Sequence, residues 1–210
     1  PDREQYVELL QETRDAAKRI EPYIQRTRVV PSAMLGIDAA VTLKCEHEQR
    51  TGSFKIRGAM NALLLLTNEE RERGVVTAST GNHGRAVAEA ADALAITATV
   101  FAPSNASPEK IEAIQRIGTK VLRYGDDCLE AERAARLHGE RLGARYISPY
   151  NDRAVIAGQG SLAVELHEQV AGLDAVVVSL GGGGLASGVA GYLKSISPTI
   201  RVIGVSPKRS

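Results

Sequence analysis

The residue with the clearest chemical potential is Lys55, in the stretch Ser-Phe-Lys-Ile-Arg-Gly-Ala at residues 53–59. It stands between Phe54 and Ile56, just after a Thr-Gly turn and at the head of an apolar helix, so its amine is expected to be partly desolvated. Desolvation lowers the pKa of a lysine and makes the amine a nucleophile toward carbonyl groups. A single lysine at such a position is more often an exposed residue of a helix's first turn. Two further motifs favour the chemical interpretation.

The first of these motifs is a run of four glycines, Gly181 to Gly184, between an apolar strand and a helix. Such a run leaves backbone N–H groups free at the positive end of the helix dipole, which suits a phosphate. A flexible loop is the simpler alternative. Gly181, Gly183 and Ala186 also satisfy the G-x-G-x-x-A pattern of dinucleotide sites, but the following strand ends at Ser206 instead of the acidic residue that a ribose requires.

The second motif is Ala-Ser-Thr-Gly-Asn-His-Gly at residues 78–84. Asn82 carries an amide, while Ser79, Thr80 and the N–H groups of the loop suit a carboxylate. A helix N-cap followed by a surface histidine, His83, is the alternative that the sequence leaves open. The combination with Lys55 favours a binding site.

With Gly-Gln-Gly-Ser at residues 158–161, these motifs occur in the order and spacing of the fold-type II pyridoxal-phosphate enzymes. The chain resembles that family from about Arg28 to its last residue. It is most similar to the serine/threonine dehydratase and serine racemase branch, particularly to threonine-dehydratase-like proteins of ectoine and hydroxyectoine utilisation. The resemblance implies pyridoxal 5'-phosphate as cofactor, a small amino acid as substrate and a homodimer or higher homo-oligomer.

The resemblance also implies the roles of individual residues. Lys55 would attach the cofactor and take the Cα proton, and Thr80 is a second catalytic candidate because racemases of this branch place a serine there. The residues implied to bind the cofactor are Phe54, Lys55, Asn82, Gly181, Gly182, Gly183, Gly184 and Leu185. Those implied to bind the substrate are Ser79, Thr80, Asn82 and His83.

The implied activity is dehydration and deamination of a β-hydroxy amino acid such as L-threonine or L-serine, giving a 2-oxo acid and ammonia. Cysteine-synthase-like members have threonine at the position of His83 and usually an aspartate at that of Ile56, so β-replacement is disfavoured. A serine-racemase-like activity and a non-catalytic ligand-binding domain remain the alternatives.

The elements around these motifs predict an α/β fold. Apolar spacing predicts an amphipathic helix over residues 4–25, ended or kinked at Pro22, and a buried helix over 56–66. Strands are expected at 40–45, 74–78, 96–101, 120–124, 145–148, 175–180 and 201–205. Further helices are expected at 85–94, 108–117, 126–142, 154–170 and 185–195, the second of them capped by Ser107. This alternation implies parallel strands joined by right-handed crossovers.

The resemblance specifies the fold as tryptophan synthase β-like, with two open twisted sheets flanked by helices. It divides the chain into a large cofactor-binding domain, residues 1–77 and 149–210, and a small mobile domain, residues 78–148. The sequence stops one strand after the glycine run, so the C-terminal part of the large domain, including the group that faces the pyridine nitrogen, is expected to be missing.

Composition excludes several classes of function. The 210 residues are 43% hydrophobic and carry a net charge of +1, with no basic stripe for a nucleic acid. No apolar run is long enough to span a bilayer. Two cysteines and no recognisable leader indicate a cytoplasmic protein. Cys45 and His47 are too few to bind zinc, so no metal site is expected.

Overall fold

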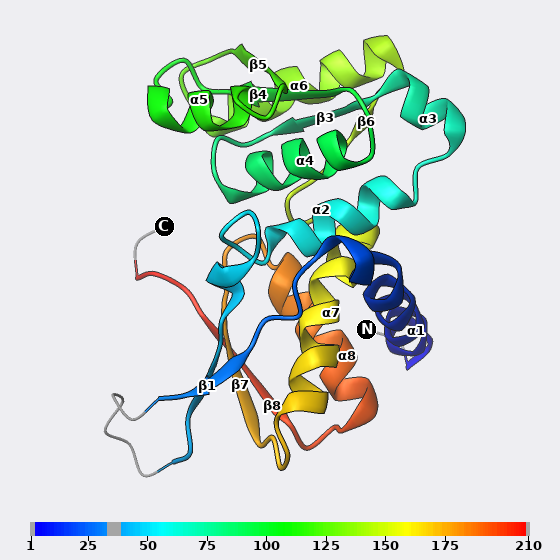
Figure 1. The fold of residues 1–210 in the computed structure, drawn as a ribbon, viewed down its shortest axis with the longest axis vertical. Coiled ribbons are helices and arrows are strands. Elements are labelled where there is room, and N and C mark those ends of the chain that lie inside the picture. Colours follow the sequence, from blue (N-terminus) through cyan, green and yellow to red (C-terminus); the bar gives the residue numbers. More distant parts are fainter. Residues whose placement is uncertain (1–2, 33–38, 209–210) are drawn as a thin grey trace.

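The structure is a computed structural model that describes residues 3–32 and 39–208, and it is α/β, as predicted (Figure 1). One unit is a four-stranded parallel sheet in the order β5-β4-β3-β6. Its strands are β3 (Val75–Ala78), β4 (Ala98–Ala102), β5 (Lys120–Arg123) and β6 (Arg145–Tyr146). Its helices are α4 (Asn82–Ala93), α5 (Pro108–Gln115) and α6 (Cys128–Leu142). Buried contacts place α6 on one face of the sheet and α4 with α5 on the other.

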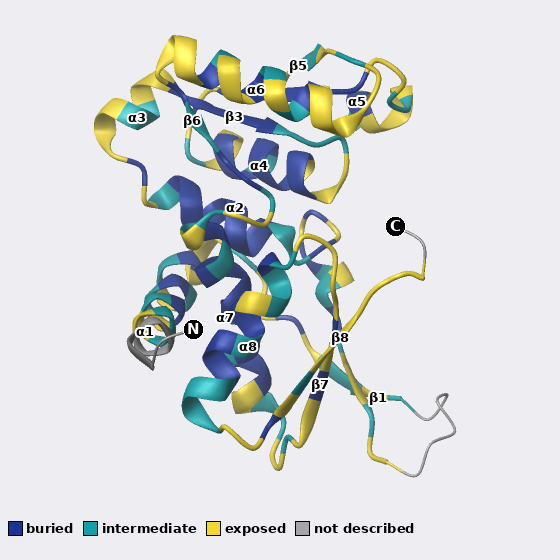
Figure 2. Ribbon diagram, turned by 180° about the vertical axis from the view of Figure 1, so that it is seen from behind, coloured by how far each residue is buried: buried dark blue, intermediate teal, exposed yellow. Residues whose placement is uncertain are grey.

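The second unit is built on three helices that pack together, α1 (Arg3–Ile20), α7 (Arg153–Gln169) and α8 (Gly184–Ile196). Beside them lie two parallel strands, β7 (Ala175–Ser179) and β8 (Arg201–Val205), and an antiparallel pair, β1 (Val29–Pro31) and β2 (Thr42–Lys44). In β7, Val176 and Val178 are buried against the helices whereas Val177 is 66% exposed. The two-stranded sheet therefore has one covered and one open face (Figure 2).

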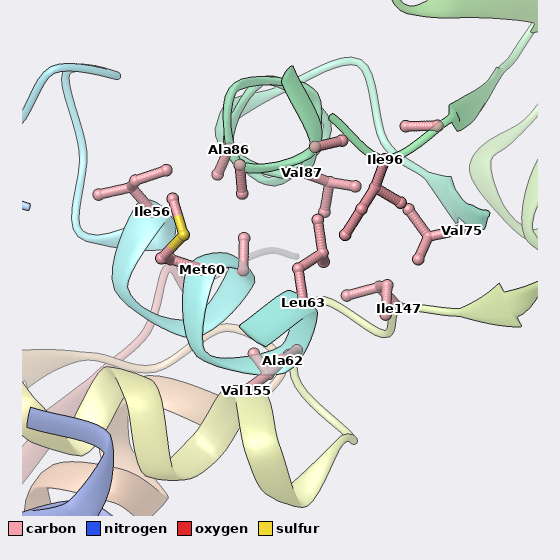
Figure 3. Packing of buried hydrophobic residues seen from close by; sticks show 14 of the residues in the cluster. Ile56, Met60, Ala62, Leu63, Val75, Ala86, Val87, Ile96, Ile147 and Val155 are labelled. Carbon is pink, nitrogen blue, oxygen red and sulfur yellow. The ribbon is translucent and has the colours of Figure 1, made fainter. Parts of the chain in front are cut away.

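Helix α2 (Lys55–Leu64) joins the two units. Figure 3 shows its side chains Ile56, Met60 and Leu63 directed toward α4, while Ala62 lies against Val155 of α7. The remaining short elements are η1 (Glu21–Tyr23), η2 (Glu46–Glu48) and α3 (Asn68–Arg73). Lys55, the first residue of α2, is thus held by an element that is buried on both sides.

Several predicted boundaries need correction. Helix α1 ends at Ile20 because Pro22 continues the chain as a single 3-10 turn. Helix α4 begins at Asn82, three residues before the predicted start, so Asn82 and His83 belong to a helix. The side chain of Ser107 hydrogen-bonds to Glu109 and does not cap α5.

Other expectations hold or stay open. The parallel strand pairings and the bounds of β8 are as predicted. The division into a large and a small domain remains a prediction, and the four-stranded sheet begins at Val75, before the expected boundary at residue 78. None of the helices in the described ranges is long and apolar enough to cross a membrane.

Candidate functional site

Lys55 opens α2, and its amine points away from the helix toward the chain that follows β6. Its Nζ donates a hydrogen bond to the carbonyl oxygen of Pro149 at 2.9 Å and lies 5.3 Å from the centre of the Phe54 ring. Burial lowers the pKa of Lys55 below its ordinary value. The structure therefore gives this amine the desolvation that the sequence predicts.

The glycine run lies between β7 and the first turn of α8. Gly183 has φ +91°, a left-handed conformation that favours glycine, and it turns the chain into the helix. The Leu180 N–H continues the pairing of β7 with β8, because it donates to the Val205 carbonyl oxygen at 2.7 Å. Within the described chain, the N–H groups of Gly181 to Gly184 that follow it donate to no protein acceptor. Free amides at a helix N-terminus are available to an anion.

A cavity of about 320 Å³ separates Lys55 from these amides. Its lining residues are Phe54, Lys55, Tyr150, Ser179, Leu180, Gly181, Gly182, Gly183, Gly184, Leu185, Val205 and Pro207. The structure thus brings together Phe54, Lys55, Leu185 and all four glycines, which the sequence had selected from segments more than 120 residues apart.

Tyr150 is one of the lining residues that the sequence analysis did not select. It packs against the glycine run so closely that a Cβ on Gly182 would lie 2.8 Å from the Tyr150 Cβ and nearer still to the ring. A Cβ on Gly184 would lie 2.9 Å from the Tyr150 Cα. Its position after β6, at the carboxyl end of a parallel strand, is the signal that could have identified it.

The Ser-Thr-Gly-Asn-His-Gly segment begins at the carboxyl end of β3 but does not line this cavity. Ser79 and Thr80 are half-buried, and Asn82 is exposed at the first position of α4. Ser79 Oγ accepts a hydrogen bond from Gly81 N–H at 3.2 Å. A Cβ on Gly84 would meet the Ser79 backbone, so a glycine is needed for α4 to start so close to β3.

His83 is buried, with 3% of its surface exposed. Its Nε2 lies 3.1 Å from the Ile147 carbonyl oxygen, and within the described part of the chain its Nδ1 has no partner. Burial, aided by the positive charge of Lys55, lowers the pKa of His83 to about 4. The ring is therefore neutral at pH 7, with the proton on Nε2, which donates to Ile147, and a free acceptor at Nδ1.

A buried group of charges behind Lys55 was not predicted. The fully buried guanidinium of Arg57 bonds to Glu46 at 2.8 Å, and to Glu165 and Ser161 at 2.7 and 3.1 Å. Lys44 forms a second ion pair with Glu165. These contacts tie η2, α2 and α7 together. In the described ranges, no three His, Cys, Asp or Glu side chains are grouped as metal ligands.

Comparison with known proteins gives a consistent result. The chain is 42% identical to an L-threonine ammonia-lyase of Thermotoga maritima over 93% of its length and 49% of that protein's. It is 42% identical to a serine racemase of Arabidopsis thaliana, of which it covers 63%, and to an L-threo-3-hydroxyaspartate ammonia-lyase of Saccharomyces cerevisiae, of which it covers 60%. The chain thus spans about half to two thirds of the length of these curated relatives.

Solved structures agree with the sequence matches. Maize serine racemase superposes with a TM-score of 0.90 at 40% identity, over 95% of this chain and 61% of that one. Threonine deaminase isoform 2 of Solanum lycopersicum superposes with a TM-score of 0.91 at 34% identity. The match covers 99% of this chain and 57% of that one. The family described as pyridoxal-phosphate dependent enzyme matches residues 20–210. The chain belongs to this family of pyridoxal-phosphate dependent enzymes.

Proposed function

We propose that the protein is an ammonia-lyase that removes water and then ammonia from a β-hydroxy amino acid such as L-threonine or L-serine. The observation that carries this proposal is the placement of a half-buried lysine amine across a cavity from four free backbone amides. Threonine and hydroxyaspartate ammonia-lyases among the relatives support the substrate class. The chain covers 49% and 60% of the lengths of those two proteins, so the activity of the whole protein is a proposal.

The residues around the cavity fit pyridoxal phosphate. The N–H groups of Gly181 to Gly184 would bind its phosphate, because they have no other acceptor in the described chain and stand at the head of α8. Lys55 would bind its aldehyde, since the lowered pKa leaves more of the amine unprotonated. Phe54 and Leu185 would flank the ring.

When bound, pyridoxal phosphate supplies an electron sink for the bond that breaks at Cα. In the proposed reaction Lys55 Nζ takes the Cα proton and returns a proton to the departing β-hydroxyl, which leaves as water. Hydrolysis of the released unsaturated amine then consumes one water and gives the 2-oxo acid and ammonia. Ser79, Thr80 and Asn82 would orient the substrate and its carboxylate, which requires the segment at residues 79–82 to approach the cavity. The neutral ring of His83 would add no charge to a bound substrate.

A racemase is the second candidate, and the serine racemases among the relatives favour it. Racemisation needs a proton donor on the face of Cα opposite Lys55. Thr80 would be that donor, because it carries a half-buried hydroxyl in the segment that would hold the substrate. An unperturbed hydroxyl is a poor acid and β-branching stiffens its rotamer, so elimination is the preferred proposal.

The test is covalent capture of the cofactor. Incubation with pyridoxal phosphate, followed by borohydride reduction and peptide mass mapping, is expected to mark Lys55 and to produce visible absorbance before reduction. Lys55→Ala should lose the label and, in the full-length protein, fall below about a tenth of wild-type turnover. A labelled wild-type protein that turned over no hydroxy amino acid would favour a non-catalytic ligand-binding domain.

Other parts of the proposal rest on the composition of the sequence or on the family resemblance. We expect a homodimer or higher homo-oligomer and a cytoplasmic location, and we expect no nucleic-acid or membrane partner. The link to ectoine utilisation is likewise a prediction, which growth of a deletion strain on ectoine would test.

A further inference from the structure

The Gly-Gln-Gly-Ser motif at residues 158–161 is not used by the proposed reaction, yet it lies in the middle of the helix that supports Lys55. These residues are buried within α7, between α2 and α8. Glycines let the three helices approach closely. A Cβ on Gly158 would lie 2.6 Å from the Arg57 carbonyl oxygen, and one on Gly160 would lie 3.0 Å from the Gly188 carbonyl oxygen of α8.

The first turn of α2 lacks the usual means of stabilisation. Its N-cap residue is Phe54, which has helical dihedral angles and no side chain that could accept a hydrogen bond. Arg57 N–H reaches back to the Phe54 carbonyl at 3.1 Å. The next amide, that of Gly58, instead donates to the side-chain oxygen of Gln159 at 3.2 Å. Gln159 therefore supplies, from another helix, the hydrogen-bond acceptor that a capping side chain normally supplies to a first turn.

The environment of Gln159 indicates that this hydrogen bond is its main polar contact. Its side chain is fully buried, and its Nε2 has no acceptor within the described residues. A buried polar group is costly, so a leucine or methionine would suit the packing better if packing were the only requirement. What the glutamine adds is one acceptor directed at the turn that carries Lys55.

We propose that Gln159 is a positioning residue for Lys55: its carbonyl group holds the first turn of α2 so that the lysine amine faces the glycine run across the cavity. The same helix contacts α8 through Gly160, so α7 sets the separation between the amine and the phosphate-binding amides. The inference rests on the proposed function for its chemical consequence, but the geometry that it concerns is present without cofactor.

The test compares Gln159→Met with wild-type protein and with a matched control. Methionine keeps the length of the side chain and removes the acceptor. Asn61→Leu is the control, because Asn61 also joins α2 to α7, through a 2.7 Å bond to the Ala154 carbonyl, but lies farther along the helix. Both variants lose contacts between the same two helices. Only Gln159→Met loses one in the turn of Lys55.

The first measurement is the pH dependence of Lys55 acetylation by acetic anhydride in cofactor-free full-length protein, read by peptide mass spectrometry. Gln159→Met is expected to raise the pH midpoint by about half a unit or more, because a loosened turn exposes the amine to water. Asn61→Leu should lower the thermal unfolding midpoint without moving the pH midpoint. Equal pH midpoints in all three proteins, or equal shifts in both variants, would overturn the proposal.

The second measurement is the dissociation constant of pyridoxal phosphate. It should rise up to about tenfold in Gln159→Met, the upper range of one hydrogen bond. An unchanged dissociation constant in Gln159→Met, or an equal rise in Asn61→Leu, would refute the positioning role. Wild-type protein that bound no cofactor would contradict the proposed function, whereas the acetylation midpoints would still test Gln159.

Discussion

The contact between Tyr150 and the glycine run makes a sharp prediction, because two adjacent glycines there differ in their surroundings. A Cβ on Gly182 would collide with the Tyr150 side chain, whereas a Cβ on Gly181 would have no atom within 4 Å. Gly182 and Gly181 both have φ outside the left-handed region, so backbone strain does not separate them. Gly182→Ala and Gly181→Ala therefore add the same methyl group with different steric consequences.

Overpacking of this kind costs about 1 to 3 kcal/mol. If the cost falls on the loop conformation that binds the cofactor, Gly182→Ala should weaken pyridoxal-phosphate affinity by about 5- to 150-fold. Gly181→Ala should stay within about 0.5 kcal/mol of wild type. Equilibrium titration with cofactor, followed by absorbance, measures both, and urea unfolding of the same proteins shows whether the cost also appears in stability.

The reasoning can be refuted in two ways. Equal affinities for the two variants would show that Tyr150 does not press on the loop. Adding Tyr150→Ala to Gly182→Ala removes the ring atoms from the collision, so it should recover at least about 0.5 kcal/mol of the lost affinity. A double variant no better than the single one would place the effect elsewhere in the loop.

Two further variants test other parts of the site. Thr80→Ala should leave dehydration of an L-substrate within about tenfold of wild type while it removes any D/L interconversion, a separation of at least about 1.4 kcal/mol between the two barriers. Chiral chromatography measures this, and racemisation that outruns 2-oxo acid formation in the wild type would contradict the lyase assignment. Arg57→Met should lower the free energy of unfolding by about 3 to 5 kcal/mol, because it leaves Glu46 and Glu165 buried without their main partner. Urea unfolding measures that loss, and a change below about 1 kcal/mol would show that Lys44 alone can balance both carboxylates.

The sequence carried most of the information about the framework. Strand β8 has the predicted bounds, and the run at residues 175–179 forms β7, because β-branched residues in short apolar stretches strongly favour strands. The predicted start of α4, residue 85, was wrong because of the glycines that precede it. Gly84 was expected to precede the helix, whereas it lies in the first turn of α4 and is a glycine because the helix begins against the Ser79 backbone.

Contacts between helices could not be predicted from spacing along the chain. Arg57 is completely buried in α2, although periodicity assigns an arginine to the exposed face of a helix. Its partners Glu46 and Glu165 are 11 and 108 residues away in the sequence. Gln159 is a similar case, since nothing in its own segment shows that α2 packs against it. Lys55 and the glycine run were recognisable because their motifs occur together in the order and spacing of a known family.

The free energy of unfolding is expected to depend on pH through the buried ring of His83. Its folded-state pKa is about 4, because burial and the charge of Lys55 disfavour the protonated ring, whereas the ordinary histidine value is 6.5. Between these values the unfolded chain binds a proton that the folded chain does not, so the free energy of unfolding falls as pH drops from 6.5 toward 4. The neutral ring thus contributes stability that is fully present above pH 6.5, and the loss across this window is on the order of 3 kcal/mol.

The variant His83→Gln should remove this dependence, because an amide does not titrate and its N–H can still donate to the Ile147 carbonyl. His47 is exposed on η2, so His47→Gln is the matched control and should keep the wild-type slope. Urea unfolding of all three proteins at half-unit intervals from pH 7.5 to 4.5 gives the comparison. An equally steep loss of stability in His83→Gln would refute this assignment, because a carboxylate such as Glu165, whose pKa is lowered in the folded state by Arg57 and Lys44, loses its contribution only below the ordinary value of 4.5. A flat profile in His83→Gln with a sloping one in His47→Gln would assign that response to the single buried ring between α4 and the segment that contacts Lys55.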